Sequence, residues 1–591
     1  MRYPSLNKYS CTDGAEYQDD QYNLTRTTPI PTRTRTSTVT TAQVHGLRRR
    51  ISTVFARVSS NLGGRDRRSN NTSTRKDTPL PPLRPLPSLP PELWIQILEY
   101  STYPSSSHVC LETELPTSFL SPALSPASFG PRLAHYRATM AHKRNLTLVS
   151  REWNAYAQPV LYEFVWVARS KQAQALALTL LCGAYCLAAG KASSFASASL
   201  AALTDPDAQP PFRPPAPAHV RAGVGRFIKR LHVETPPLER CNPADLRLIV
   251  DYAPALEVYS DVRSVRRRPA AQDALFAALA AGGGLRRLTW TNYDDPALVG
   301  LGVGLGGTGA MGARLEYLEL SLVSSARVAA LCTPSTTASG LALPALRTLK
   351  VTLDNAAFAA LSTWALPALR HLSVLSADFS YAGEGFARFF AVHGARLRQL
   401  ELGHSSAHLE EHYLTGRPGG GGGAQGALSL ATWCPALEEF VCSADAAWNW
   451  QHPDWIAPHT LLSAHPRVSL IGIRGIDARL RDDYAAAAVG ADDNAFFFRL
   501  REQVESLLRR EAFPRLKYVR DMSAGSDALR RGVVGLCHEK DSDSDAPGDA
   551  RVVRFWEGVL GRCKEEGVWL EDWRGVNVTT GSLRRAHAGC A

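Results

Sequence analysis

The chain has 591 residues, 45% hydrophobic, 8% aromatic and 20% charged, a globular composition that excludes a chain disordered throughout, a collagen and a pure coiled coil. The formal net charge is +11, but residues 1–80 carry 14 Lys or Arg against 6 Asp or Glu, a net charge of +8. The rest of the chain carries only +3, so it offers no basic face for nucleic acid, and we expect no nucleic-acid partner.

Residues 1–86 are rich in Ser, Thr and Arg and poor in large apolar residues. Such a segment cannot bury enough surface to offset the entropy of ordering it, so we predict a disordered basic tail. It contains no apolar stretch of the kind found in secretory signals. The 11 cysteines are widely spaced without a C-x-x-C pair, which favours reduced thiols and a cytoplasmic or nuclear location.

After the tail the chain becomes aromatic and apolar with helical spacing. Pro91 suits the first position of a helix. Leu93 with Ile97, and Trp94 with Leu98, are i,i+4 pairs that give this short helix a broad apolar face.

A second motif follows a long Pro- and Ser-rich stretch. Leu146, Val149 and Trp153 lie at i, i+3 and i+7, a further helical pattern, and the apolar run from Pro159 to Val167 closes the unit.

These motifs together resemble the F-box family, in the version common in fungal proteins: L-P-x-E-L-x-x-x-I-L, then L-V-S-x-x-W, then L-Y. The resemblance covers residues 87–168 and departs from the family in an insertion near 101–142. It implies a short all-α domain that docks on a Skp-type adaptor and, through it, on a cullin. Carried over by position, the implied adaptor contacts are Leu89, Pro90, Leu93, Ile97, Leu98, Leu148, Val149 and Trp153.

Residues 169–219 read as a helical stretch followed by a Pro-rich linker. The apolar run Ala173–Gly190 just reaches the length of a membrane span, but it contains Gln174, Thr179 and Tyr185 and many alanines. We therefore expect a buried Ala/Leu helix and no membrane partner.

Residues 220–591 repeat one pattern, with apolar residues at position 1, at +3 and usually at +5. The ten copies start about 32 residues apart. Two copies have Asp261 and Asp521 at the last of these positions. The copies begin at Ile228, Leu256, Leu285, Leu315, Leu346, Leu369, Leu397, Leu437, Val468 and Leu516.

This L-x-x-L-x-L pattern resembles the leucine-rich repeat, with longer and less regular spacing. The fold class we predict is α/β: short all-α F-box helices followed by an irregular leucine-rich-repeat-like solenoid, with the disordered N-terminal tail. The first, fourth and sixth residues of each copy should point into the core, and the third, fifth and seventh should line a concave face.

The predicted concave face is polar and of mixed charge, which suits a protein ligand better than a phosphate backbone or a lipid. Its target-binding residues are predicted to be Arg230, His232, Arg287, Thr289, Tyr317, Glu319, Lys350, His371, Gln399, Glu401, Glu439 and Arg474.

Two short motifs match the residue patterns of known functional signatures but lack their structural context. His408 and His412 belong to an H-x-x-E-H pattern that has no third ligand, and Gly302–Gly307 matches G-x-G-x-x-G without the strand and long helix of a nucleotide fold. We therefore expect no metal, no cofactor and no catalytic residue.

The architecture implies a non-catalytic substrate-recognition subunit of an SCF-type ubiquitin ligase. The F-box would dock on the Skp-type adaptor, and the repeat domain would bind an unknown target protein. The alternative is a scaffolding leucine-rich-repeat protein whose F-box-like helices cap the solenoid, since solenoids need a distinct terminal cap.

Overall fold

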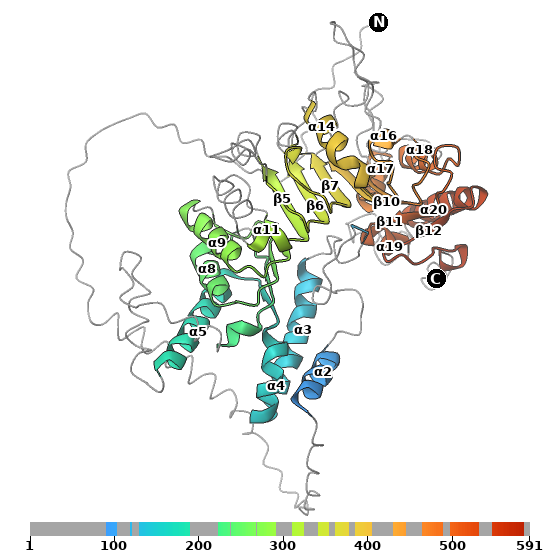
Figure 1. Cartoon of the computed structure of the whole chain (residues 1–591). Coiled ribbons are helices and arrows are strands. Elements are labelled where there is room, and N and C mark those ends of the chain that lie inside the picture. The colour runs from blue at the N-terminus through green and yellow to red at the C-terminus, as the bar shows by residue number, and fades with distance from the viewer. Residues whose placement is uncertain are drawn as a thin grey trace, which may run out of the picture. The chain divides into compact units, whose positions relative to one another are not determined.

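The computed structural model describes residues 90–102, 119–120, 129–189, 223–236, 238–266, 269–290, 310–323, 341–353, 358, 361–376, 384–404, 430–444, 462, 464–487, 497–530 and 547–583. The predicted tail, residues 1–86, lies outside these ranges. The described chain begins with helices and continues as a long sheet with helices between its strands (Figure 1).

In the described part of the chain, three helices precede the sheet. They are α2 (Pro91–Thr102), α3 (Phe129–Thr147) and α4 (Arg151–Tyr162). Helix α2 begins at Pro91 as predicted. Helix α4 begins after Ser150, whose hydroxyl accepts a hydrogen bond from the Trp153 N–H at 3.1 Å, so the serine of the second motif caps the helix.

Among the described residues, twelve strands form one sheet in the order of the chain, and every neighbouring pair is parallel. The strands are β1 (Phe164–Val167), β2 (Arg230–Val233), β3 (Val258–Asp261), β4 (Arg287–Trp290), β5 (Tyr317–Val323), β6 (Thr348–Leu353), β7 (His371–Ser376), β8 (Gln399–His404), β9 (Glu439–Ser443), β10 (Leu470–Arg474), β11 (Tyr518–Asp521) and β12 (Trp569–Glu571).

In the described residues helices lie between most neighbouring strands along the chain, as is usual for the crossover connections of a parallel sheet. The α-helices are α5 (Ser170–Ala189), α8 (Pro243–Asp251), α9 (Pro269–Ala281), α11 (Ala310–Arg314), α14 (Glu384–His393), α16 (Leu430–Trp433), α17 (Ile476–Ala487), α18 (Phe498–Leu507), α19 (Ala524–Arg530) and α20 (Pro547–Glu565). The 3-10 turns are η3 (Val224–Phe227) and η4 (Gly394–Arg396).

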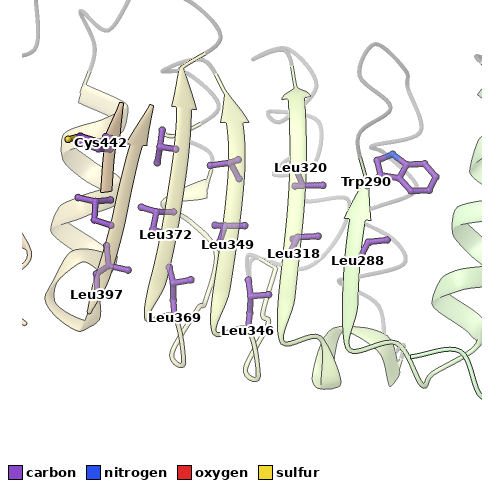
Figure 2. Close-up of a cluster of buried hydrophobic side chains, with 14 of the residues drawn as sticks. Leu288, Trp290, Leu318, Leu320, Leu346, Leu349, Leu369, Leu372, Leu397 and Cys442 are labelled. Atoms are coloured by element: carbon purple, nitrogen blue, oxygen red, sulfur yellow. The ribbon is translucent and has the colours of Figure 1, made fainter. Parts of the chain in front are cut away.

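The repeat pattern builds the core. In every copy the first, fourth and sixth residues are buried, and equivalent residues pair across the sheet, as Leu318 with Leu349 and Leu349 with Leu372 do. Figure 2 shows Leu288, Leu318, Leu349 and Leu372 side by side on successive strands. These side chains form one cluster with apolar residues of the connecting helices. The predicted leucine-rich-repeat-like α/β solenoid is therefore confirmed.

The solenoid starts earlier than the predicted boundary at residue 220. Strand β1 pairs with β2 through Phe164 and Arg230, and helix α5 contributes Ala173, Ala177 and Leu180 to the common core. The helix expected in the Ala/Leu run is thus present, but it buries only one side and leaves the other exposed, and it belongs to the first repeat. The motif-based domain 87–168 likewise ends in a strand, because Phe164–Val167 is a continuous run of aromatic and β-branched residues that suits a strand covered on both faces.

The two aspartates at core positions are buried with their repeats. Asp521 accepts hydrogen bonds from the Arg530 guanidinium at 2.7 Å, from the Ser523 N–H at 3.0 Å and from the Ser526 hydroxyl. Arg530 stacks on Trp556, with its guanidinium carbon 4.6 Å from the ring centroid. A polar network therefore replaces the apolar side chain that this position has in most other repeats.

Candidate functional site

The three N-terminal helices have a small core of their own. Leu98 of α2 packs with Ala157 and Val160 of α4 in a cluster separate from the solenoid core. Trp94 of α2 and Trp153 of α4 add a ring contact, with centroids 5.6 Å apart. The helical unit, as we call α2, α4 and the C-terminal part of α3 together, therefore has a small core distinct from that of the solenoid, and it meets the solenoid through Tyr162 at the end of α4, which packs on the main core.

This unit leaves large apolar side chains in solvent. Leu93 and Ile97 of α2 are 43% and 45% exposed, and Leu148 and Val149, in the turn before α4, are both 60% exposed. Single exposed apolar residues are common on protein surfaces, but four on one small unit make it a candidate for a binding surface. We call Leu93, Ile97, Leu148 and Val149 the apolar surface.

The other predicted adaptor contacts are placed differently. Pro90 is exposed, Trp153 is partly buried beneath Trp94, and Leu89 lies outside the described residues. Leu98 is only 2% exposed, because its position one residue after Ile97 turns it toward α4. Its side chain packs on α4, on the inner side of α2.

Helix α3 joins the helical unit to the solenoid. Near its start, Leu133 and Tyr136 pack on Phe164 and Trp166 of β1. The Tyr136 hydroxyl accepts a hydrogen bond from the Trp166 N–H at 3.1 Å. Phe164 and Trp166 alternate with the core residue Val167 and lie on the sheet face opposite the core. Helix α3 therefore covers the first strand on that face.

The face opposite the core is the predicted concave face, and we call it the polar face. Of its twelve predicted residues, four are buried and eight are half-buried. The buried residues are Thr289, Tyr317, Gln399 and Glu401, and the half-buried ones are Arg230, His232, Arg287, Glu319, Lys350, His371, Glu439 and Arg474.

Charged groups on the polar face pair across neighbouring strands. Glu319 accepts from the Lys350 ammonium and from the Tyr317 hydroxyl, both at 2.9 Å, and Arg287 stacks on the Tyr317 ring at 4.0 Å. Burial opposes ionisation of Glu319, but Lys350 and Tyr317 outweigh burial and lower the pKa of this carboxyl. The carboxylate therefore stays charged, and the pairing fixes the side chains that a ligand would meet.

His232, near the start of the polar face, is held between two partners. Its Nε2 lies 3.0 Å from the Glu234 carboxylate, and its Nδ1 lies 3.2 Å from the Ser260 hydroxyl. Burial lowers the pKa of His232, although Glu234 acts in the opposite direction. Glu234 also accepts a 2.7 Å hydrogen bond from Arg132 of α3, so α3 and β2 are linked at this end of the face.

One apolar part of the polar face was not predicted from the sequence. Val441, Leu470 and Gly472, on strands β9 and β10, form an apolar area on which Leu120 packs. The signal was present, because Glu439–Ser443 and Leu470–Arg474 have apolar residues at both phases of the alternation. A strand buried on both faces has that pattern.

No metal site emerges in the described ranges. No three His, Cys, Asp or Glu side chains gather there as a metal site, and His408, His412 and Gly302–Gly307 lie outside them. Burial raises the pKa of the thiols of Cys241, Cys434 and Cys563 to about 12, so these three remain protonated. Within the same ranges every helix is too short or too polar to cross a bilayer.

No known protein-family model matches the sequence. No curated protein is significantly similar to it. The chain's own geometry therefore defines it as a leucine-rich-repeat-like α/β solenoid that carries a small helical unit with an apolar surface.

Proposed function

We propose that the chain is a non-catalytic substrate receptor of an SCF-type ubiquitin ligase. The helical unit docks on a Skp-type adaptor, which links it to a cullin, and the polar face of the solenoid holds the target protein. The observation that carries the proposal is the exposure of Leu93, Ile97, Leu148 and Val149 on a unit that packs without them. These are positions at which the F-box resemblance implies adaptor contacts.

The mechanism is proximity. A receptor of this kind makes and breaks no covalent bond. It holds target lysines near the charged conjugating enzyme and so raises their effective concentration there. For short flexible links in favourable geometry this concentration is roughly millimolar. Cytoplasmic or nuclear location, where such ligases act, is part of the proposal.

The second candidate is a scaffolding solenoid in which the same helices serve as a cap. The packing of Leu133 and Tyr136 on β1 supports this candidate, because α3 covers the first strand. The two candidates predict different effects on solenoid stability when α2 is disturbed. A capping role requires the array to lose stability when α2 is disturbed, whereas an adaptor-docking role does not.

The test is the double substitution Leu93→Asp/Ile97→Asp in the full chain. Buried apolar anchors dominate protein interfaces, so we expect affinity for a purified Skp-type adaptor to fall at least about 100-fold in calorimetry. The melting temperature of the solenoid should stay unchanged, because both side chains are exposed.

The matched control is Val392→Asp, which changes an exposed apolar residue on α14, away from the helical unit. It should leave adaptor affinity unchanged. Wild-type protein that is folded and shows no adaptor binding contradicts the ligase proposal. A cooperative loss of solenoid stability in the double variant supports the capping candidate instead.

A further inference from the structure

Two residues of the insertion between α2 and α3 lie on the polar face. Phe119 and Leu120 are buried against strands 280 or more positions later in the chain. The Phe119 N–H donates to the Gln399 side-chain carbonyl at 2.7 Å, and the Phe119 carbonyl accepts from the Arg474 guanidinium at 2.8 Å. The Leu120 carbonyl accepts a longer hydrogen bond from Arg520 at 3.5 Å.

Each of the three side chains that hold this dipeptide is itself held by a carboxylate. The Gln399 amide donates to Glu439 at 2.5 Å, Arg474 pairs with Glu401, and Arg520 donates to Glu571 at 2.8 Å. Such second contacts fix the donors and acceptors in place before a ligand arrives, which lowers the entropy cost of binding.

The side chain of Leu120 fills the space above Gly472, which has no side chain of its own. Leu120 packs with Val441, Leu470 and Met522, a cluster separate from the main core. A Cβ at Gly472 would lie 3.3 Å from the Leu120 Cδ2 atom and 3.2 Å from the Met522 Cγ atom. Glycine in this strand therefore makes room for an aliphatic side chain over the sheet.

These contacts are of the kind that a separate peptide can make. The hydrogen bonds go to main-chain groups of the dipeptide, which lies in a turn and whose main-chain groups every peptide has, and the Leu120 pocket selects the side chain. The dipeptide also lies on the face opposite the repeat core, among residues predicted to bind a target. Phe119 and Leu120 therefore lie on the sheet where a bound peptide ligand would lie.

We propose that the polar face from β8 to β12 binds a turn-forming segment of a partner protein with an aromatic residue followed by leucine. Phe119–Leu120 is the internal ligand of this site, and a partner must displace it. The inference rests on the proposed function only in assigning target binding to the polar face, and it does not require adaptor docking.

An internal ligand lowers the apparent affinity for an external one, because only the fraction of molecules whose site is empty can bind the external ligand. A tethered segment has an effective concentration of roughly millimolar order, so even a weak internal ligand fills its site. Removing the two side chains should therefore strengthen binding of an external peptide about tenfold or more.

The test uses the full chain and a fluorescein-labelled peptide with the sequence of residues 113–126. The substitution pair Phe119→Ser/Leu120→Ser empties the site. We expect fluorescence anisotropy to report binding to this variant at least about tenfold tighter than to wild type. A peptide with Ser at both positions should not bind. Adding Gly472→Val to the emptied chain should abolish binding, because the valine occupies the Leu120 pocket.

Melting temperature and adaptor affinity are measured on the same samples. If the emptied chain is folded and binds no peptide, the inference is overturned. If the double change unfolds the protein, the milder Leu120→Ala is used, which keeps the main-chain hydrogen bonds; unfolding of that variant too makes the dipeptide part of the core and overturns the inference. Loss of adaptor binding with intact peptide binding counts against the proposed function alone.

Discussion

The indole rings of Trp94 and Trp153 lie with their centroids 5.6 Å apart and their planes at 49°, and this contact joins α2 to α4 beside the buried Leu98. Offset aromatic pairs of this kind contribute about 0.5–1.5 kcal/mol beyond the area they bury. The pair therefore sets the position of α2, and with it the position of Leu93 and Ile97.

Trp153→Ala should release α2 from α4. We expect a loss of about 3–5 kcal/mol in the stability of the helical unit, as for other large aromatic truncations, and a large loss of adaptor affinity. The solenoid has its own core, so its melting transition should not move. Hydrogen exchange of α2 and α4 amides measures the first effect, and equal loss of protection across the sheet would contradict it.

Tyr136→Phe tests the contact between α3 and the sheet. The change removes the hydroxyl that accepts from the Trp166 N–H at 3.1 Å, so we expect a loss of about 1–3 kcal/mol, seen as faster exchange of the β1 amides. Tyr156→Phe is the matched control, because its hydroxyl bonds to Glu152 at the surface, and it should have little effect. Identical behaviour of the two variants would show that α3 does not hold β1.

His465 should make the solenoid sensitive to acid. Its Nε2–H donates to the Cys434 carbonyl at 3.0 Å, and its Nδ1 accepts from the N–H groups of Arg467 and Val468 at 3.1 and 3.2 Å. Protonation of Nδ1 would destroy both of the latter hydrogen bonds. Burial lowers the pKa of His465, and Arg467 adds to this, while the Cys434 carbonyl acts the other way.

Because the folded pKa lies below the unfolded value of about 6.5, the unfolded chain binds more protons as the pH falls through that range. The stabilisation is complete above about pH 6.5 and declines below it, by up to about 1.4 kcal/mol per pH unit for each such histidine. Urea unfolding between pH 5 and 8 measures this slope. His465→Gln should lower stability at pH 7.5 and flatten the slope, whereas His142→Gln, on the exposed side of α3, should change neither.

Arg530 and Asp521 form a buried ion pair whose side chains are 3% and 0% exposed. Arg530→Met leaves the Asp521 carboxylate buried without its cation, and we expect a loss of about 3–5 kcal/mol. The double variant Arg530→Met/Asp521→Leu removes both charges, so most of the stability should return. Denaturant unfolding of the three proteins measures this, and equal losses in the single and double variants would rule out the charge as the cause.

The sequence predicted the solenoid because its signal is local and repeated. In copies such as Leu346, Leu349 and Val351, the spacing alone places the three side chains on one side of the strand, and ten similar copies leave few other arrangements. Strands β1 and β12 were missed because a single four-residue or three-residue strand has no repeat beside it to set its register.

The candidate sites divide in the same way. The exposure of Leu93 and Ile97 follows from a helix that is apolar around much of its circumference and can bury only one side of it. The burial of Leu98, one residue further on, depends on where α4 lies. Likewise, no spacing in the sequence indicates that Phe119 meets Gln399, because the two are 280 residues apart.

The sequence by itself therefore determined the repeat, its core positions and the composition of the helical unit, since each depends on residues within a few turns or one strand of each other. Only the tertiary structure decided which apolar residues stay in solvent, where the sheet begins, and that an insertion dipeptide occupies the polar face. These depend on contacts between distant segments, and side-chain shape and hydrogen bonding in three dimensions select them.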